Sequence, residues 1–301
     1  MEGQKTRRRT DLKPYALILP VLILCGFFTI YPFAQALYYS FINYVIYKPQ
    51  EQGQFLGFKN YQIVVTSSFF REAMMNTVMF TAFSVSSIVL IAIGVSLVLN
   101  QKFRGAGFVR AVMLIPWAIP PAAAGLIWRY MFQSTGWINK VMVDSGLWKE
   151  AVYFLAAPRF IQVAYAVVAQ LWQQLPFSVL LLLAVMQLIP KDIHDSAEVD
   201  GASGFKKFRY ITLPFIKSAV GLVAAFQAFL ALTTYDLVFA FAGGAFGLIS
   251  YYTFAATFTW GNFGQGAALG VILALLSLGV IFVILRIVPP EKLYRYSFTG
   301  E

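Results

Sequence analysis

Residues 195–214 read DSAEVDGASGFKKFRYITLP, a charged segment between two long apolar stretches. The segment opens with an acid and small residues, has a glycine at Gly201, and ends in Leu213-Pro214, where the next apolar stretch begins. Where the flanking stretches cross a membrane, a polar loop of this kind is a place for a cytoplasmic protein to bind. The composition of the whole chain decides whether they do.

The composition places the chain in a lipid bilayer. Of the 301 residues, 59% are apolar and only 12% are charged, which is too little polar surface for a soluble domain of this size. The net charge of +10 does not indicate a nucleic-acid partner, because the basic residues are not gathered into one patch with interleaved aromatic residues. We therefore expect lipid around the chain and no nucleic acid.

Six apolar stretches are long enough to cross a hydrocarbon core, which takes about 20 residues as a helix. Backbone groups in lipid must be bonded within their own segment, so helices are expected rather than open strands. The expected spans are residues 16–40, 73–99, 108–132, 161–188, 213–240 and 267–288. The fold class is thus an all-α six-helix transmembrane bundle over residues 16–288, with a basic segment at 1–15 and a tail at 289–301.

The distribution of Lys and Arg predicts the orientation, because these residues favour the cytoplasmic side. Sixteen of the 23 lie on the side that holds both termini and the loop at 195–214, and seven lie on the other. Both termini and this loop are therefore expected in the cytoplasm. The first apolar run, residues 15–32, exceeds the roughly 7 to 15 residues of a signal-peptide core, so we expect it to remain a span.

No catalytic or metal site is expected. The chain has one His, His194, and one Cys, Cys25, far apart in sequence, whereas such sites need several converging side chains. It contains no Gly-Lys dipeptide, so a phosphate-binding loop of the form G-x-x-x-x-G-K-[ST] is absent. We expect no cofactor on this chain, and any ATP and Mg must be bound by another polypeptide.

The segment at about 190–214 resembles the cytoplasmic EAA loop of ATP-binding cassette importer permeases. The family pattern is Glu-Ala-Ala, three residues, Gly, nine residues, Ile, one residue and Leu-Pro. This chain has Asp195-Ser196-Ala197, Gly201, Ile211 and Leu213-Pro214 at the same spacing. The resemblance implies a type I importer permease fold, with a short coupling helix that docks on a cytoplasmic ATPase.

Other stretches resemble the branch of this family that imports sugars, the maltose-type carbohydrate uptake permeases. They are Asp200-Gly201-Ala202, the segment from Phe55 to Tyr61 with its Gly57 and Asn60, Asn76-Thr77, and Tyr235-Asp236 followed by Gly243-Gly244, where Ala245 replaces a proline. The resemblance implies a prokaryotic plasma-membrane subunit that works by alternating access. Its implied partners are a second, non-identical permease, two ATPase subunits and an external solute-binding protein.

Within the loop, we expect one helical face for docking. Ala197, Gly201 and Phe205 recur at i, i+4 and i+8, so two small residues would admit a partner's backbone and Phe205 would fill a pocket. Asp195 is expected at the helix start, where a negative charge is favoured.

Polar residues inside the spans are candidates for a solute pathway. Gln170, Gln173 and Gln174 share one side of the fourth span around Trp172, and they either bind solute hydroxyls or bond to neighbouring helices. Trp117 lies between prolines that are expected to kink the third span. Tyr235 and Asp236 are expected near the outer face, with Asp236 roughly 33 Å along a helix from Pro214.

Three alternatives remain open from the sequence. An ion-coupled carrier would usually place paired ionisable groups near the midplane, and the first, second and fourth predicted spans contain none. The same importer class with a non-sugar solute, such as a glycerol phosphate ester, is the second alternative to a sugar importer. A membrane enzyme would need convergent polar groups that the chain does not supply.

Overall fold

The computed structural model describes residues 13–101, 103–244 and 246–289, and these residues form helices joined by short loops. The segments expected at 1–15 and 289–301 lie almost entirely outside the described residues, as does Ala245. Of two isolated β-bridges, Ile42–Phe55 lies within the loop after the first span, and Val45–Asn262 joins this loop to the one before the last span.

Five of the six expected spans are present as helices long and apolar enough to cross a membrane. The first is continuous through α1 (Lys13–Cys25), the π-helical η1 (Gly26–Ile30) and α2 (Tyr31–Tyr39). The others are α4 (Ser68–Leu99), α9 (Arg159–Met186), the continuous run of α11 (Gly204–Lys207), η4 (Phe208–Thr212) and α12 (Leu213–Thr233), and α15 (Phe263–Ile287).

The third expected span, at 108–132, is not one helix. The chain forms α5 (Ala106–Met113) and α6 (Ile115–Ala118), then turns by 95° into α7 (Pro121–Phe132) and α8 (Trp137–Asp144). Ile119 is extended, with ψ of 130°, because a residue before proline is driven out of the helical region and proline has no N–H to continue the ladder. Pro120 and Pro121 therefore break the span rather than kink it.

The fifth expected span, at 213–240, also ends early. α12 stops at Thr233, Thr234 is extended with ψ of 127°, and a separate short helix α13 (Asp236–Ala242) follows. The predicted position of Asp236, about 33 Å along one helix, is therefore wrong. α13 packs directly on α7, and a Cβ at Gly125 of α7 would lie 2.9 Å from Ala240 Cβ and still closer to the Leu237 carbonyl.

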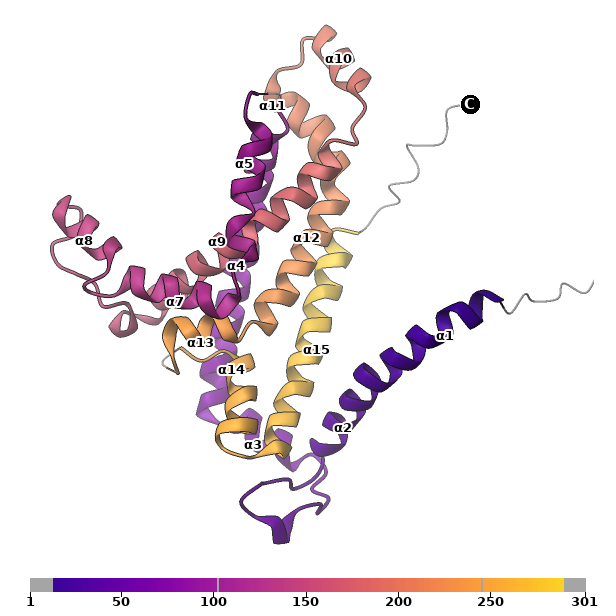
Figure 1. Ribbon diagram of the computed structural model, residues 1–301, viewed down its shortest axis with the longest axis vertical. Coiled ribbons are helices and arrows are strands. Elements are labelled where there is room, and N and C mark those ends of the chain that lie inside the picture. The colour runs from indigo at the N-terminus through magenta and orange to yellow at the C-terminus, as the bar shows by residue number, and fades with distance from the viewer. Residues whose placement is uncertain (1–12, 102, 245, 290–301) are drawn as a thin grey trace, which may run out of the picture.

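The long helices α4, α9, α12 and α15 run side by side, with α10 (Lys191–Val199) and α11 at one end of the bundle and α3 (Lys59–Thr66) near the other (Figure 1). The helix α14 (Ile249–Phe254) and the π-helical η5 (Ala255–Thr259) also lie toward the α3 end. Short 3₁₀ turns η2 (Pro49–Glu51) and η3 (Phe154–Ala156) lie in loops.

The first span stands away from the bundle. α2 packs against α15, and no residue in the apolar window of the span Leu17–Tyr39 is buried by the described residues (Figure 1). Next to it, Asn60 of the predicted family segment is 3% exposed and donates from Nδ2 to the carbonyls of Ser40 and Ile42 at 3.0 and 2.9 Å. That segment therefore fixes the end of the first span against α3.

Candidate functional site

The expected coupling helix is present as α10, but it begins at Lys191. Pro190 precedes the first turn with φ of −58° and ψ of 138°, a conformation suited to a helix entry, since proline gives up an N–H that has no partner there. Asp192, not Asp195, lies in that first turn. The prediction that Asp195 starts the helix is wrong, because Pro190 sets the entry four residues upstream.

Gly201 ends α10 instead of extending it. Its φ is +70°, a left-handed conformation that glycine adopts without steric penalty. The N–H of Ala202 donates to the Ala197 carbonyl at 2.9 Å and the N–H of Gly201 to the Glu198 carbonyl at 3.0 Å, which is the Schellman termination. Ala197, Gly201 and Phe205 therefore do not share a helical face, and that prediction is wrong.

A single ion pair ties α10 to the helix that follows. Lys207 Nζ lies 2.6 Å from Glu198 Oε1, and this hydrogen bond and the positive charge of Lys207 lower the pKa of the Glu198 carboxyl from its ordinary 4.5. The Ser203 hydroxyl accepts a weak bond from the Lys206 N–H at 3.4 Å and caps α11. The turn between the two helices is thus held by a few contacts at its ends.

Leu213 and Pro214 lie inside a continuous helix rather than at its start. Proline cannot donate to the residue four before it, and the Leu213 N–H instead bonds the Phe208 carbonyl, five residues back. The π-helical segment η4 is the result. It connects the loop rigidly to the membrane span α12.

The coupling segment is open to a partner. No residue of α10 is buried, and Val199, Phe205 and Tyr210 are 89%, 74% and 76% exposed. Val199 and Tyr210 were not among the predicted contact residues, although apolar side chains in a polar loop are a readable signal. The predicted residues that are exposed or half-buried here are Asp195, Ser196, Ala197, Asp200, Gly201, Ala202 and Phe205.

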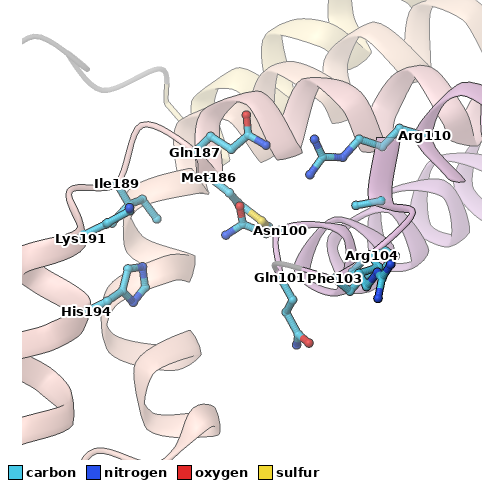
Figure 2. A pocket seen from close by; sticks show the side chains of 11 residues that line it. Asn100, Gln101, Phe103, Arg104, Arg110, Met186, Gln187, Ile189, Lys191 and His194 are labelled. Atoms are coloured by element: carbon cyan, nitrogen blue, oxygen red, sulfur yellow. The ribbon is translucent and has the colours of Figure 1, made fainter. Parts of the chain in front are cut away.

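A basic cavity of about 710 Å³ opens beside the start of α10. Figure 2 shows Lys191 and His194 on one wall and Arg104 and Arg110 on the other. Arg110 donates from Nη2 to the Leu99 carbonyl at the end of α4, at 2.7 Å. No acidic residue is among the described residues that line the cavity, so this side of the loop favours a negatively charged contact.

The two broken spans meet deep in the bundle, and side chains bond the carbonyls at both breaks. Gln173 of α9 donates from Nε2 to the Ile119 carbonyl at 2.9 Å, and Ser250 Oγ donates to the Thr234 carbonyl at 2.5 Å. Irregular backbone at membrane depth is tolerated when it is buried in protein or lines a cavity in this way. Gln173 therefore has the structural role that was one of its two predicted alternatives.

Several buried polar oxygens near these breaks have no hydrogen-bond partner within the described residues. Gln170 is 2% exposed and its Oε1 is unpaired, and Gln174 bonds Gln173 Oε1 from Nε2 at 3.3 Å but leaves its own Oε1 unpaired. Gln227 of α12 donates to Ser178 Oγ at 2.8 Å, with its Oε1 unpaired. Gln227 and Ser178 were missed by the prediction, although a polar residue in an apolar span is the same signal.

Aromatic rings lie beside the broken helices, but not all as expected. Trp117 stacks on Phe177 of α9 with ring centroids 5.3 Å apart. Trp172 packs edge-on against Trp128 at 5.9 Å and lies about 200° around α9 from Gln170 and Gln174. The predicted grouping of Trp172 with the glutamines is therefore wrong.

Tyr235 lies in the break after α12, where its ring stacks on Phe254 and Phe239 at 4.4 and 5.5 Å. Asp236 is exposed, and its Oδ1 accepts from the Leu237 N–H at 3.1 Å. No group of three or more His, Cys, Asp or Glu among the described residues is placed to hold a metal ion.

A bundle of membrane-length helices with two broken spans meeting inside it, and an exposed short helix at one end, defines a polytopic membrane permease. Comparison with known proteins identifies the family. Residues 88–289 match the family described as the inner membrane component of binding-protein-dependent transport systems, and the chain belongs to this family of importer permeases.

The relatives cover nearly the whole chain. It is 32% identical to the trehalose/maltose transport system permease protein MalF of Thermococcus litoralis, over 94% of this chain and 96% of the relative. It is 31% identical to the sulfoquinovosyl glycerol transport system permease protein SmoG of Agrobacterium fabrum, over 90% of this chain and 89% of the relative.

One solved structure shows the same fold, a chain of the bacterial alginate ABC transporter in complex with an alginate pentasaccharide-bound periplasmic protein. Its TM-score is 0.75 at 21% identity, covering 92% of this chain and 94% of that one. These findings confirm the predicted all-α importer permease fold.

Proposed function

We propose that the chain is one permease subunit of an ATP-driven, binding-protein-dependent importer for a sugar or oligosaccharide, and that it forms half of the pathway with a second, non-identical permease. The observation that carries the proposal is the meeting of two broken spans beside buried amide oxygens without partners. Discontinuous helices mark the binding region of many transporters. Unpaired acceptors in such a region call for a ligand rich in hydroxyl donors.

The chemistry of the broken region favours a neutral, polyhydroxylated solute. The unpaired oxygens of Gln170, Gln174 and Gln227 accept hydrogen bonds from hydroxyl groups, and the stacked rings of Trp117 and Phe177 offer an apolar surface for a sugar face. The names of both relatives and of the alginate transporter point to carbohydrate or glycoside solutes.

A phosphate ester is the less favoured solute. Phosphate recognition usually relies on Arg or Lys, and residues 73–99 of α4, 160–186 of α9 and 218–233 of α12 contain no charged residue. A phosphorylated solute would need all its cations from elsewhere. The sequence-level alternative of a glycerol phosphate ester is therefore weaker than a sugar.

The exposed ends of the chain support the assignment of its partners. α10 presents small and apolar side chains that the described part of the chain does not cover, which suits docking on a cytoplasmic ATPase that binds ATP and Mg. The first span has almost no apolar contact with its own bundle, which suits packing against the second permease. With both termini and α10 in the cytoplasm, closure of two ATPase subunits would move α10 and, through η4, turn α12.

Reconstituted transport tests the proposal. The full complex in proteoliposomes, with its solute-binding protein outside and ATP inside, should accumulate a labelled disaccharide, and omission of ATP should stop it. Family membership argues against the ion-coupled carrier. Accumulation driven by an ion gradient alone would overturn the ATP-driven mechanism, and accumulation of glycerol phosphate but of no sugar would overturn the solute class.

A further inference from the structure

A second polar cavity, of about 420 Å³, lies at the opposite end of the bundle from α10. One wall is the outer part of α4, where Phe69, Glu72 and Asn76 recur on one helical face. The other walls are the first turn of α9, the loop with Gly244 and Gly247, and the aromatic residues Tyr251, Tyr252 and Trp260. Its volume falls within the range of about 300–1,000 Å³ typical of small-molecule sites.

Asn76 leaves an acceptor unused on the wall of this cavity. The side chain is 6% exposed and is fixed, because Nδ2 donates to the Gly247 carbonyl at 3.0 Å. Its Oδ1 is buried and has no partner within the described residues. An unpaired buried acceptor is unfavourable, so a hydrogen bond from a ligand hydroxyl to this oxygen would be favourable.

Aromatic rings and a charged rim complete the lining. The ring of Trp260 lies 6.2 Å from Phe69 and 5.4 Å from Tyr252 between centroids. At the rim, Arg159 and Glu72 form an ion pair at 3.7 Å. Aromatic ring faces can cover the C–H groups of a sugar ring, and an amide and paired charges can bond its hydroxyls. This lining therefore suits a sugar ring.

Gly244 leaves space for the ring of Tyr251, which lies between this cavity and the break after α12. A Cβ at Gly244 would come within 2.8 Å of the Tyr251 hydroxyl oxygen, so a larger residue here would displace the tyrosine ring from its present position. The Tyr251 ring is nearly parallel to Tyr235, at 6.4 Å and 7°. The cavity is thus next to the aromatic stack at the break after α12.

We propose that this cavity is a vestibule site that holds one neutral sugar ring before it passes the Tyr235 stack. This inference depends on the proposed function for the solute class and for the external position of the cavity. The site is separate from the glutamines of α9 and α12, since its wall residues come from the outer ends of α4 and α9 and from α14.

Saturation-transfer NMR on the assembled complex in nanodiscs tests the proposal, with trehalose as the probe and no binding protein present. The dissociation constant should rise about fivefold in Trp260→Ala, recover in Trp260→Phe and rise in Glu72→Gln. Trp137→Ala on α8 is the matched control, because Trp137 does not line the cavity, and it should leave this constant unchanged. The Phe variant and Glu72→Gln keep the test valid if Trp260→Ala does not fold.

Three outcomes would overturn the vestibule site. One is no saturation transfer from the wild-type complex, and another is a loss caused by Gln174→Leu but not by the Trp260 variants. The third is weaker docking of the solute-binding protein to Trp260→Ala with trehalose binding intact. If ATP-driven sugar uptake persists in these cases, the proposed function stands without the vestibule site. If uptake is absent while trehalose binding is retained, the vestibule site stands and the proposed function fails.

Discussion

The loop around α10 and the pair of broken spans differ in where their partners are. In α10, no residue is buried, and apart from its backbone termination the segment is joined to the chain by the Lys207–Glu198 pair. At the breaks, by contrast, side chains of the same chain bond the irregular carbonyls of Ile119 and Thr234. The first region is exposed and free to contact another protein, and the second is fixed by contacts within the chain.

This difference predicts two kinds of mutational behaviour. Changes at the breaks should act first on the stability of the chain, because buried polar and close-packed groups lose their partners. Changes in α10 should leave stability unchanged and act on coupling to the ATPase. A variant at the breaks that leaves stability unchanged, or a variant in α10 that lowers it, would contradict the comparison.

The largest effect is expected from Gly125→Val, at the contact between α7 and α13. Because Cβ would meet the Leu237 backbone carbonyl, the helices must separate, and we expect a loss of about 3 kcal/mol in stability. Thermal melting in detergent measures it. Gly94→Val is the matched control, since no atom lies within 4 Å of its added Cβ; equal melting temperatures for the two variants would contradict the close approach.

The next effect is expected from Ala197→Glu in α10. An added charge on a face that must be desolvated on docking should weaken binding of the ATPase subunits by about 2 kcal/mol, roughly thirtyfold. The melting temperature of the permease should not change. Ser145→Glu adds the same charge on the side that the sequence predicts to be external and should bind the ATPase normally, whereas unchanged ATPase binding by Ala197→Glu would remove α10 as the docking element.

A paired substitution in α9 separates structure from transport. Gln173→Leu leaves the Ile119 carbonyl unpaired and should lower stability by about 1 kcal/mol. Gln174→Leu removes no bond to the backbone of the breaks and should lower sugar uptake by a few fold at unchanged stability. Melting and uptake assays on both variants decide the matter, and identical behaviour of the two would mean that they share one role.

The sequence was sufficient to predict most of the fold and the place of the loop. Apolar length located four spans to within about five residues at each end, whereas the span expected at 213–240 runs from Gly204 to Thr233. The spacing of Gly201 to Leu213-Pro214 located the exposed loop that contains α10. It failed where backbone geometry overrides periodicity. By spacing alone, Gly201 falls on the same helical face as Ala197, four residues before it. With its φ of +70°, however, it terminates the helix.

Broken spans show the same limit. Apolar length alone cannot distinguish a helix of 28 residues from two short helices that turn at Ile119 or Thr234. The polar residues that satisfy those turns, Gln173 and Ser250, come from segments distant in sequence. Only the three-dimensional contact shows why these side chains are polar.

The smallest effect is expected from breaking the Glu198–Lys207 ion pair. This test sharpens the comparison, because the pair is the one ion pair within the exposed region around α10. The pKa of Glu198 is lowered in the folded loop by its hydrogen bond to Lys207. The pair is therefore fully formed above the ordinary value of 4.5 and is lost as the pH falls through the lowered pKa. Between pH 7 and pH 5, roughly, the spacing of α10 and α11 should not change.

Spin labels on Ser196 and Arg209, in a Cys25→Ser background, measure that spacing. It should broaden only in more acidic solution, and Glu198→Gln should show the broadened distribution already at neutral pH. Asp195→Asn is the matched control, because the structure shows no ion pair for Asp195. An unchanged distribution in Glu198→Gln would mean that the turn at Gly201 holds the loop without the ion pair, and broadening in the control would mean that the change is not specific to the pair.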